Sequence, residues 1–486
     1  MSEALWTFDA LLDATGGRPV GQGPAGVVGV SIDSRTVRPG EAFFAIKGDR
    51  FDGHEFVARA LAAGAATAVV SEAKLAGLGR ITGSMVVVDD VLRALGALGR
   101  AARARSAASI VGVTGSVGKT STKEMLAHVL RAQGKVHSSA ASHNNHWGVP
   151  LTLSRLPPDA DFGVFEIGMN HAGEITRLTA MVRPHVALVT GVEPVHLEYF
   201  PSVEAIARAK GEIFSGVVAG GAAVLNRDNG YFELLRNLAR EAGIARIAGF
   251  GVHPEADARA EDVKLMPSFS EVSARIFGIR FDYTVGAPGA HIVQNSLGVL
   301  AAVALVGGDV EAAGESLAAI GPPQGRGARS RLAVGNGSAT LIDESYNANP
   351  ASMRAAIALL GQTEPGRGGR RIAVLGDMLE LGAGERALHA GLAEPLSGAK
   401  VDRVYLAGPR MAALWEALPE KVRGAHRESA AELLPILAEE LAAGDVVMVK
   451  GSNASRLGPL VAELKERFSP DKDGRPDMAA RSGGIA

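Results

Sequence analysis

One glycine-rich loop constrains the fold of this chain more than any other feature. The residues GVTGSVGKTST (112–122) continue the apolar run SIVGV (109–113) and precede the amphipathic stretch KEMLAHVLRAQG. A strand, a glycine loop and a helix in this order place backbone N–H groups and a helix N-terminus around one point, which suits a phosphate group. The loop therefore predicts an open α/β sheet that binds its ligand at the carboxyl ends of its strands.

Within this loop, the Lys119 side chain is expected to reach the β- and γ-phosphates of a nucleotide, and the Thr120 hydroxyl to bind Mg²⁺. The usual pattern G-x-x-x-x-G-K-[ST] is not met, because Val113 stands where the first glycine belongs, so the loop is a variant. The predicted phosphate-binding residues are Thr114, Gly115, Ser116, Val117, Gly118, Lys119, Thr120 and Ser121.

Further groups suited to a metal follow neighbouring predicted strands. Glu166 ends FGVFEIG, His196 follows HVALVTGV, and Lys210 lies on the next predicted helix, which Ser202 can cap. Each has an ordinary alternative: a solvated or capping carboxylate, a structural histidine, and a lysine whose stem packs while its ammonium reaches water. Carboxylates at the ends of strands would instead face the ligand crevice, where Mg²⁺ needs them.

The composition excludes several classes of protein. The formal net charge is −2 and no basic face is visible, so we expect no nucleic-acid partner. With no cysteine, disulfides and thiolate metal sites are excluded. The N-terminus does not resemble a signal peptide and no apolar run is long enough to span a bilayer, so we expect a cytoplasmic protein.

The 486 residues are too many for one ordinary core. Strands alternating with helices predict an α/β fold in three domains: a small α/β N-terminal domain, a central P-loop domain with a doubly wound parallel sheet, and a C-terminal Rossmann-like sheet. The predicted ranges are 1–106, 107–324 and 325–468, with a mobile tail at 469–486.

Seven segments together resemble the Mur ligase family, the ATP-dependent amide-forming enzymes of peptidoglycan synthesis. They are TGSVGKTSTKEM, NNHWGVPLTL, FEIGMNHAGEI, VEPVHLEYF, AKGEIF, IDESYNANPASM and KGSNASRL. The resemblance is strongest to the members that add D-alanyl-D-alanine to UDP-N-acetylmuramoyl-tripeptide through an acyl phosphate. It implies these two small-molecule substrates, ATP and Mg²⁺, and we expect a monomer.

Two other functions stay open at this point. One is a related ligase that adds a single amino acid, either the third stem residue of peptidoglycan or glutamate on folate. The other is a regulatory P-loop NTPase that acts as a binding switch.

The resemblance also assigns catalytic roles. It implies that Lys210 is carbamylated by CO₂ and, with Glu166 and His196, helps to hold magnesium, while Thr120 and Glu166 hold a metal at the phosphates. Burial would favour this role, because it lowers the pKa of a lysine and leaves a neutral amine that can react with CO₂. The implied catalytic residues are Lys119, Lys210, Glu166 and His196.

The remaining assignments concern the nucleotide and the substrates. Asn295 would contact adenine, and Arg326 and Asp343 would reach the ribose and phosphates, although Arg326 could be an ordinary linker charge. Asn145 would lie near the muramyl end, and the N-terminal domain would bind the UDP end through groups that could also be plain surface residues. The predicted contacts for the UDP end are Ser34, Arg35 and Lys47, and those for the dipeptide are Tyr346, Asn347, Asn349, Lys450, Gly451 and Ser452.

Overall fold

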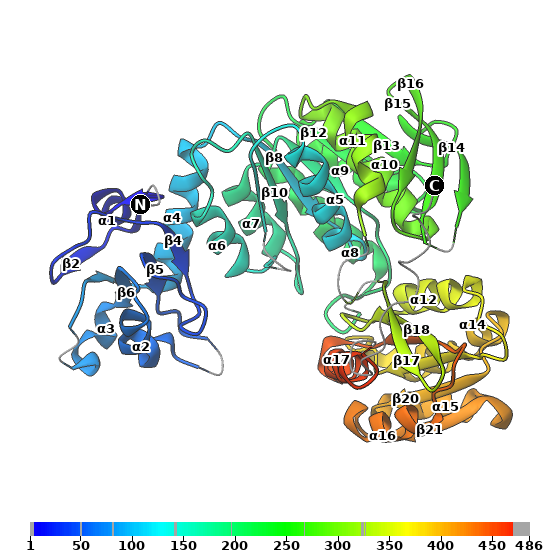
Figure 1. The fold of residues 1–486 in the computed structure, drawn as a ribbon. Helices are drawn as coiled ribbons and strands as arrows, with labels where there is room; N and C mark the ends of the chain where they lie inside the picture. The colour runs from blue at the N-terminus through cyan, green and yellow to red at the C-terminus, as the bar shows by residue number, and fades with distance from the viewer. Residues whose placement is uncertain are drawn as a thin grey trace, which may run out of the picture.

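The computed structural model describes residues 4–469, apart from 49–50, 80–81, 140–142, 196, 267, 322–324 and 326. The chain forms three α/β parts, each built on its own main sheet (Figure 1). His196, Arg326 and nearly all of the predicted tail lie outside the described residues. No described helix has the length and apolar character needed to cross a bilayer.

The N-terminal part contains a five-stranded sheet in the order β2-β7-β6-β5-β4 and a small pair, β1-β3. β4 to β7 are parallel, and β2 adds to β7 in the antiparallel direction. Its elements are β1 (Trp6–Thr7), α1 (Phe8–Thr15), β2 (Arg18–Val20), β3 (Gly26–Val27), β4 (Gly29–Ser31), β5 (Glu41–Phe44), α2 (Val57–Ala62), β6 (Thr67–Ser71), α3 (Glu72–Leu75), β7 (Met85–Val88) and α4 (Val91–Arg105).

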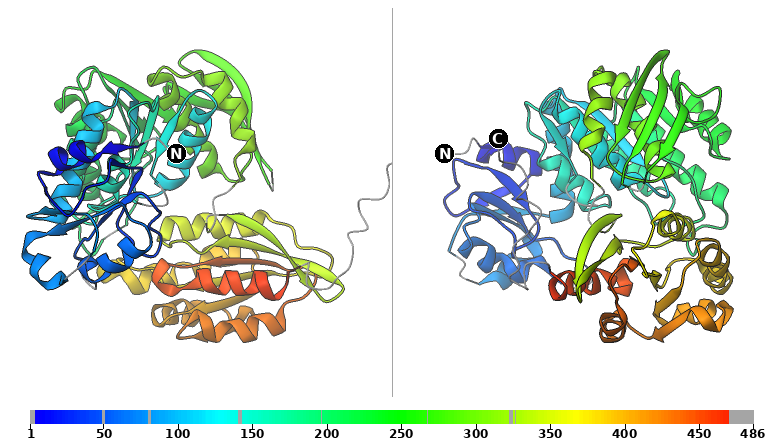
Figure 2. Two further views of the ribbon diagram at one scale, coloured as in Figure 1. Left: turned by 60° about the vertical axis from the view of Figure 1, so that its left-hand side comes forward. Right: turned by 45° about the vertical axis from the view of Figure 1, so that its right-hand side comes forward.

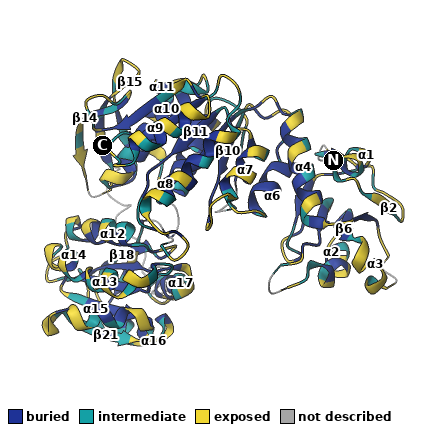
Figure 3. Cartoon of the chain, turned by 180° about the vertical axis from the view of Figure 1, so that it is seen from behind, coloured by how far each residue is buried: buried dark blue, intermediate teal, exposed yellow. Residues whose placement is uncertain are grey.

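The middle part contains a nine-stranded sheet in the order β16-β15-β14-β13-β12-β11-β8-β10-β9. β8 to β14 are parallel, and the central strands β8, β10, β11 and β12 are almost entirely buried, as expected for a sheet with helices on both faces (Figure 3). Its first elements are β8 (Ser109–Thr114), α5 (Lys119–Arg131), β9 (Val136–Ser138), α6 (Gly148–Ser154), β10 (Phe162–Glu166), α7 (Glu174–Val182), β11 (Val186–Val189), α8 (Val203–Gly211), β12 (Ala222–Asn226), α9 (Phe232–Glu241) and β13 (Arg246–Gly251).

The order of this sheet explains where its ligand must bind. After β8 the chain builds β9 and β10 on one side, and then returns to build β11 to β13 on the other. The loop after β8 therefore lies at the point where the winding reverses, which is where open α/β sheets form a crevice at the carboxyl ends of their strands.

Three further strands, which the sequence patterns did not reveal, extend this sheet: β14 is parallel to β13, and β15 and β16 then follow as antiparallel neighbours. The remaining elements of the middle part are β14 (Ala258–Leu265), β15 (Ser270–Ile276), β16 (Ile279–Val285), α10 (Ala290–Leu305) and α11 (Val310–Ser316).

The C-terminal part contains a six-stranded sheet in the order β17-β18-β22-β19-β20-β21, parallel except for β17. Its elements are β17 (Ala328–Val334), β18 (Gly337–Glu344), α12 (Pro350–Gln362), β19 (Arg371–Gly376), α13 (Glu385–Ala390), α14 (Ala393–Gly398), β20 (Arg403–Ala407), α15 (Ala412–Ala417), β21 (Arg423–Arg427), α16 (Ala430–Glu440), β22 (Val446–Lys450) and α17 (Leu457–Arg467). The three-part α/β fold predicted from the sequence is confirmed.

The N-terminal and middle parts share one hydrophobic core. Leu11 and Leu95 belong to the same buried cluster as Leu151 and Ile206 of the middle part. The helix α4 connects the two parts, and the N-terminal part lies beside the middle part in the views of Figures 1 and 2. The C-terminal sheet has separate cores on its two faces, so its attachment to the middle part depends on loops.

Arg103 fastens the end of α4 to the middle part. Its buried guanidinium donates to the carbonyl oxygens of Val182 at 2.8 Å and Arg183 at 2.9 Å.

We expect Arg103→Met to lower the free energy of unfolding by about 1–3 kcal/mol, because it leaves carbonyls without donors. The matched change Arg100→Met, at an exposed position of the same helix, should cost less than about 0.5 kcal/mol. Urea unfolding followed by tryptophan fluorescence measures both, and equal effects would contradict the assignment.

Candidate active site

The phosphate loop depends on two glycines in left-handed conformations. Gly115 has φ 147° and Gly118 has φ 81°. A Cβ on Gly115 would lie 2.0 Å from Thr190 Oγ1, and one on Gly118 would lie 2.8 Å from Asn295 Nδ2. The Thr190 hydroxyl also donates to the Val117 carbonyl at 2.5 Å, so the loop is held against β11.

The first turn of α5 lies open beside this loop. Gly118 precedes the helix and has no side chain, so it supplies no side-chain cap to the first turn of α5. Lys119 folds back over the loop and donates to the carbonyl oxygens of Gly115 at 2.6 Å and Ser116 at 3.3 Å. A helix N-terminus with an ammonium beside it is an anion site.

The Glu166 carboxylate at the end of β10 is buried and held from two sides. Thr120 Oγ1 donates to Oε2 at 2.9 Å, and Asn144 Nδ2 donates to Oε1 at 2.7 Å. The structure therefore brings Thr120 and Glu166 together, at the loop that also carries Lys119.

Lys210 is completely buried, so its ammonium does not reach water and the alternative of a solvent-reaching side chain is wrong. Ser202 caps α8 as predicted, through a 3.1 Å bond from the Ala205 N–H. Among the described residues, none forms a hydrogen bond with Lys210 Nζ. Burial lowers the Lys210 pKa well below its ordinary value, and the charge of Lys119 lowers it further, against the opposing effects of Glu212 and Glu166.

Within the described part of the chain, no three histidines or carboxylates gather into a metal site. The oxygen donors nevertheless suit magnesium, because a buried carboxylate and a hydroxyl meet beside the anion site. The buried Lys210 nitrogen without a hydrogen-bond partner in the described structure is a further polar group that requires an explanation.

A cavity of about 870 Å³ lies between the middle and C-terminal parts. It joins the carboxyl ends of the two parallel sheets, with the phosphate loop on one wall and the loop after β18 on the other. The predicted residues that line it are Ser116, Val117, Gly118, Lys119, Thr120, Ser121, Asn145, Glu166, Asn295, Tyr346, Asn347, Asn349 and Lys450.

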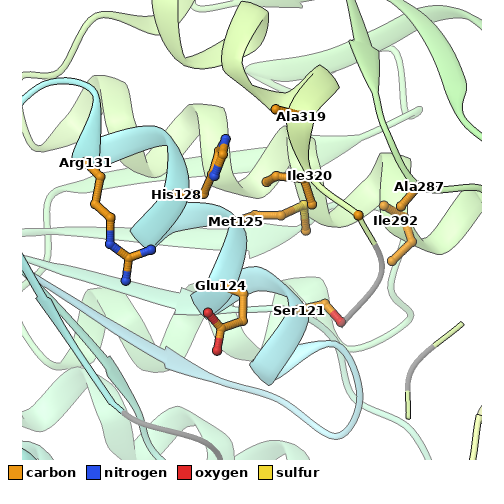
Figure 4. Close-up of a pocket in the computed structure, with 10 residues that line it drawn as sticks. Ser121, Glu124, Met125, His128, Arg131, Ala287, Ile292, Ala319 and Ile320 are labelled. Atoms are coloured by element: carbon orange, nitrogen blue, oxygen red, sulfur yellow. The ribbon is translucent and has the colours of Figure 1, made fainter. Parts of the chain in front are cut away.

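A second hollow, of about 320 Å³, lies along α5 (Figure 4). Met125, Ile292 and Ile320 form an apolar wall, while Glu124 and Arg131 supply charge. It shares Ser121 and Ile292 with the large cavity, so the two meet at the start of α5 and the beginning of α10.

Comparison with known proteins identifies the family. Family models match the chain at residues 26–105 (Mur ligase family, catalytic domain), 113–303 (Mur ligase middle domain) and 329–453 (Mur ligase, glutamate ligase domain). The UDP-N-acetylmuramoyl-tripeptide--D-alanyl-D-alanine ligase of Escherichia coli is 34% identical over 437 residues, which cover 90% of this chain and 93% of the relative. The chain belongs to the Mur ligase family.

Further relatives indicate the type of Mur ligase. The Bacillus subtilis ligase of the same name is 34% identical over 90% of this chain and 93% of the relative. The crystal structure of MurF from Acinetobacter baumannii has a TM-score of 0.81 and 30% identity, covering 95% of this chain and 99% of that one. MurF from Thermotoga maritima in complex with ADP has a TM-score of 0.73 and 26% identity, covering 90% and 98%. This Mur ligase is therefore of the MurF type.

The C-terminal residues that we predicted for this Mur ligase divide into two groups. Lys450 Nζ is buried and donates to the Asn347 carbonyl at 2.9 Å, while Tyr346 is 38% exposed at the cavity. The Asn349 side chain caps α12 by accepting from the Ser352 N–H at 2.9 Å, so this residue has a local structural role at the start of the helix as well as a place in the cavity wall.

The other C-terminal predictions lie within the fold, and none of them belongs to the described lining of the large cavity. The Asp343 carboxylate accepts from the Ser345 hydroxyl at 2.6 Å. The Ser452 N–H donates to the Asp377 carbonyl at 3.1 Å. A Cβ on Gly451 would lie 2.5 Å from Leu457.

The residues predicted for the UDP end lie on the N-terminal part, away from both cavities. Arg35 forms a 2.6 Å ion pair with Asp33, which lowers the Asp33 pKa. Ser34 is buried. Lys47 is exposed, and its backbone forms an isolated antiparallel β-bridge with Asp52. Their roles in binding stay predictions.

Two residues at the site were missed in the sequence. Asn144 donates to the Glu166 carboxylate directly, whereas the side chain of its neighbour Asn145 accepts from the Gly148 N–H at the start of α6 at 3.0 Å. The pair of asparagines was visible, but only the geometry separates their roles. Thr190 ends the apolar run HVALVT, so it is a polar residue at the end of a predicted strand, as Glu166 is. A threonine in that place indicates a ligand site less strongly than a glutamate does.

We expect Gly115→Ala to weaken binding of a non-hydrolysable ATP analogue by about tenfold or more, because Ala disfavours this φ and its Cβ would collide with Thr190. The control is Gly230→Ala, since an added Cβ there meets no atom within 4 Å. Isothermal titration calorimetry measures both affinities. Equal affinity of the folded Gly115→Ala variant and the wild type would show that the loop does not hold the phosphates.

Proposed function

We propose that this Mur ligase joins D-alanyl-D-alanine to UDP-N-acetylmuramoyl-tripeptide at the expense of ATP. The products would be UDP-N-acetylmuramoyl-pentapeptide, ADP and phosphate, in peptidoglycan synthesis. One observation carries the proposal: a single cavity is shared by the phosphate loop and by the loop DESYNANP of the C-terminal part. The related ligases of Escherichia coli and Bacillus subtilis support the choice of substrates.

The chemistry requires two steps at one place. An oxygen of the tripeptide carboxylate attacks the γ-phosphorus of ATP, the bond to the β-phosphate oxygen breaks, and ADP leaves. The amine of D-alanyl-D-alanine then attacks the acyl carbon, loses a proton and expels phosphate. Both partners of the first step are anions, so positioning and neutralisation of charge carry most of the catalysis.

The chain supplies this neutralisation from its own groups. The open N-terminus of α5 and the Lys119 ammonium face the place where the phosphates would lie. Thr120 and Glu166 would hold magnesium, which when bound reduces the negative charge of the phosphates. The apolar hollow formed by Met125, Ile292 and Ile320 would receive the adenine, with Asn295 beside the loop.

Lys210 would act as its carbamate, together with His196. Its depressed pKa leaves the amine neutral, so the nitrogen can attack CO₂, form an N–C bond and release a proton. The product is an anion with oxygen ligands, which magnesium prefers. The nearby positive charge of Lys119 disfavours a protonated Lys210 but stabilises a carbamate at the same position.

The substrates would then extend in opposite directions from the phosphate loop. Tyr346, Asn347 and Lys450 would line the dipeptide site, supported by the strand ends behind them at Gly451 and Ser452. Asp343, with Arg326, would contact the nucleotide from the C-terminal part. The UDP end would bind on the N-terminal part at Ser34, Arg35 and Lys47, with Asn145 near the muramyl group. We further propose that the enzyme acts in the cytoplasm as a monomer.

The substrate test separates this proposal from its rivals. With ATP, Mg²⁺ and UDP-N-acetylmuramoyl-tripeptide, we expect phosphate release and a pentapeptide product with D-alanyl-D-alanine, but not with single amino acids or glutamate. Mass spectrometry identifies the new amide. A product formed only with a single amino acid would favour the related ligases, and ATP hydrolysis without any amide would favour a regulatory NTPase.

We expect Lys210→Ala to lower turnover by about a hundredfold or more, because a group that stabilises the charge of the transferred phosphate is lost. Affinity for a non-hydrolysable ATP analogue should change less than about threefold, since Lys119 and α5 remain. The matched control is Arg208→Ala, which removes a half-exposed cation from the same helix. Turnover near the wild-type level in Lys210→Ala would refute the role of the carbamate.

A further inference from the structure

A second buried lysine lies one helical turn beyond Thr120 and has no part in the chemistry above. Lys123 is completely buried on α5. Its Nζ donates to the Ser139 carbonyl at 2.8 Å and pairs with the Glu124 carboxylate at 2.6 Å. Residues three apart on a helix share a face, so Lys123 and Thr120 both point toward β10.

Ser139 connects this lysine to the site. The Ser139 N–H donates to the Val164 carbonyl of β10 at 3.2 Å, and the Glu166 N–H donates to Ser139 Oγ at 3.3 Å. The ammonium therefore anchors the residue that aligns the backbone of Glu166, while Thr120 contacts the carboxylate of the same glutamate.

Lys123 also lies within electrostatic reach of His143, the residue before Asn144. Burial lowers the pKa of His143, and the charges of Arg155 and Lys123 lower it further. Asn144 in turn donates from its side chain to Glu166 and accepts at its carbonyl from the Gly168 N–H at 2.8 Å. A Cβ on Gly168 would lie 2.8 Å from the Asn144 side chain, so this part of the site is closely packed.

We propose that Lys123 is a positioning residue that fixes the Glu166 carboxylate for magnesium by holding Ser139. The inference rests on the proposed function, because it takes Glu166 as a metal ligand. A buried ammonium is costly, and an apolar side chain of similar size often stabilises a fold better. The hydrogen bond to Ser139 explains why a lysine is present in this place.

The test compares Lys123→Met, Lys123→Arg and Ser139→Ala with the wild type. The readout is the gain in affinity for a non-hydrolysable ATP analogue when Mg²⁺ replaces EDTA, measured by calorimetry. We expect this gain to fall by about tenfold in Lys123→Met. Affinity in EDTA should stay unchanged, and Lys123→Arg should recover part of the gain. Ser139→Ala keeps the carbonyl that Lys123 binds but removes the oxygen that accepts from Glu166, so it should also lose part of the gain.

Lys135→Met is the matched control, because the Lys135 side chain is 71% exposed and pairs with Asp159 at the surface. Circular dichroism shows which variants fold. A folded Lys123→Met with an undiminished magnesium gain would overturn the proposal. If Lys123→Met does not fold, an undiminished gain in Ser139→Ala overturns it instead. Failure of the wild type to form the amide would count against the proposed function, whereas loss of the gain only in the variants supports the role of Lys123.

Discussion

The two hydrogen bonds to the Glu166 carboxylate organise this site. Thr120 comes from the helix after the phosphate loop and Asn144 from the segment before α6, so one side chain joins two otherwise separate loops. A carboxylate buried in this way must be satisfied or it would be strongly destabilising. The same geometry leaves oxygen atoms next to the open end of α5, which is where the charge of a nucleotide has to be balanced.

Around this carboxylate, burial controls the character of the charged groups. Lys119 lines the cavity and donates to the Gly115 carbonyl, whereas Lys210 is completely buried and its pKa is lowered, which favours the neutral amine. The two lysines are within electrostatic reach of one another but differ in burial and in hydrogen-bond partners. Lys123 is a third case, in which a buried ammonium is satisfied by a carbonyl and a carboxylate.

Local patterns in the sequence predicted the elements of the fold well. The glycine loop, the apolar runs and the Ser202 cap each depend on neighbouring residues only, and β8, α5 and α8 form where these patterns indicate. The strands β14–β16 were not foreseen: a bulge between Ala260 and Asp262 interrupts the alternation of β14, whereas the regular alternation of β15 was present in the sequence and was overlooked. The distinction between Asn144 and Asn145, and the inward position of Ser452 and Asp343, depend on contacts between distant segments, so no local pattern could reveal them.

The common core beneath α4 has a consequence for the choice of substrate. Because the N-terminal and middle parts pack as one body, the distance from the surface proposed for the diphosphate to the phosphate loop is set by the fold. The C-terminal part has its own cores and contacts the middle part through loops, for example from the Glu198 N–H to the Glu380 carbonyl at 3.4 Å. On the proposed function, a rigid span between the two anion sites selects a peptide stem by its length. A shorter stem would bind at its nucleotide end and still leave its terminal carboxylate out of reach of the phosphoryl group.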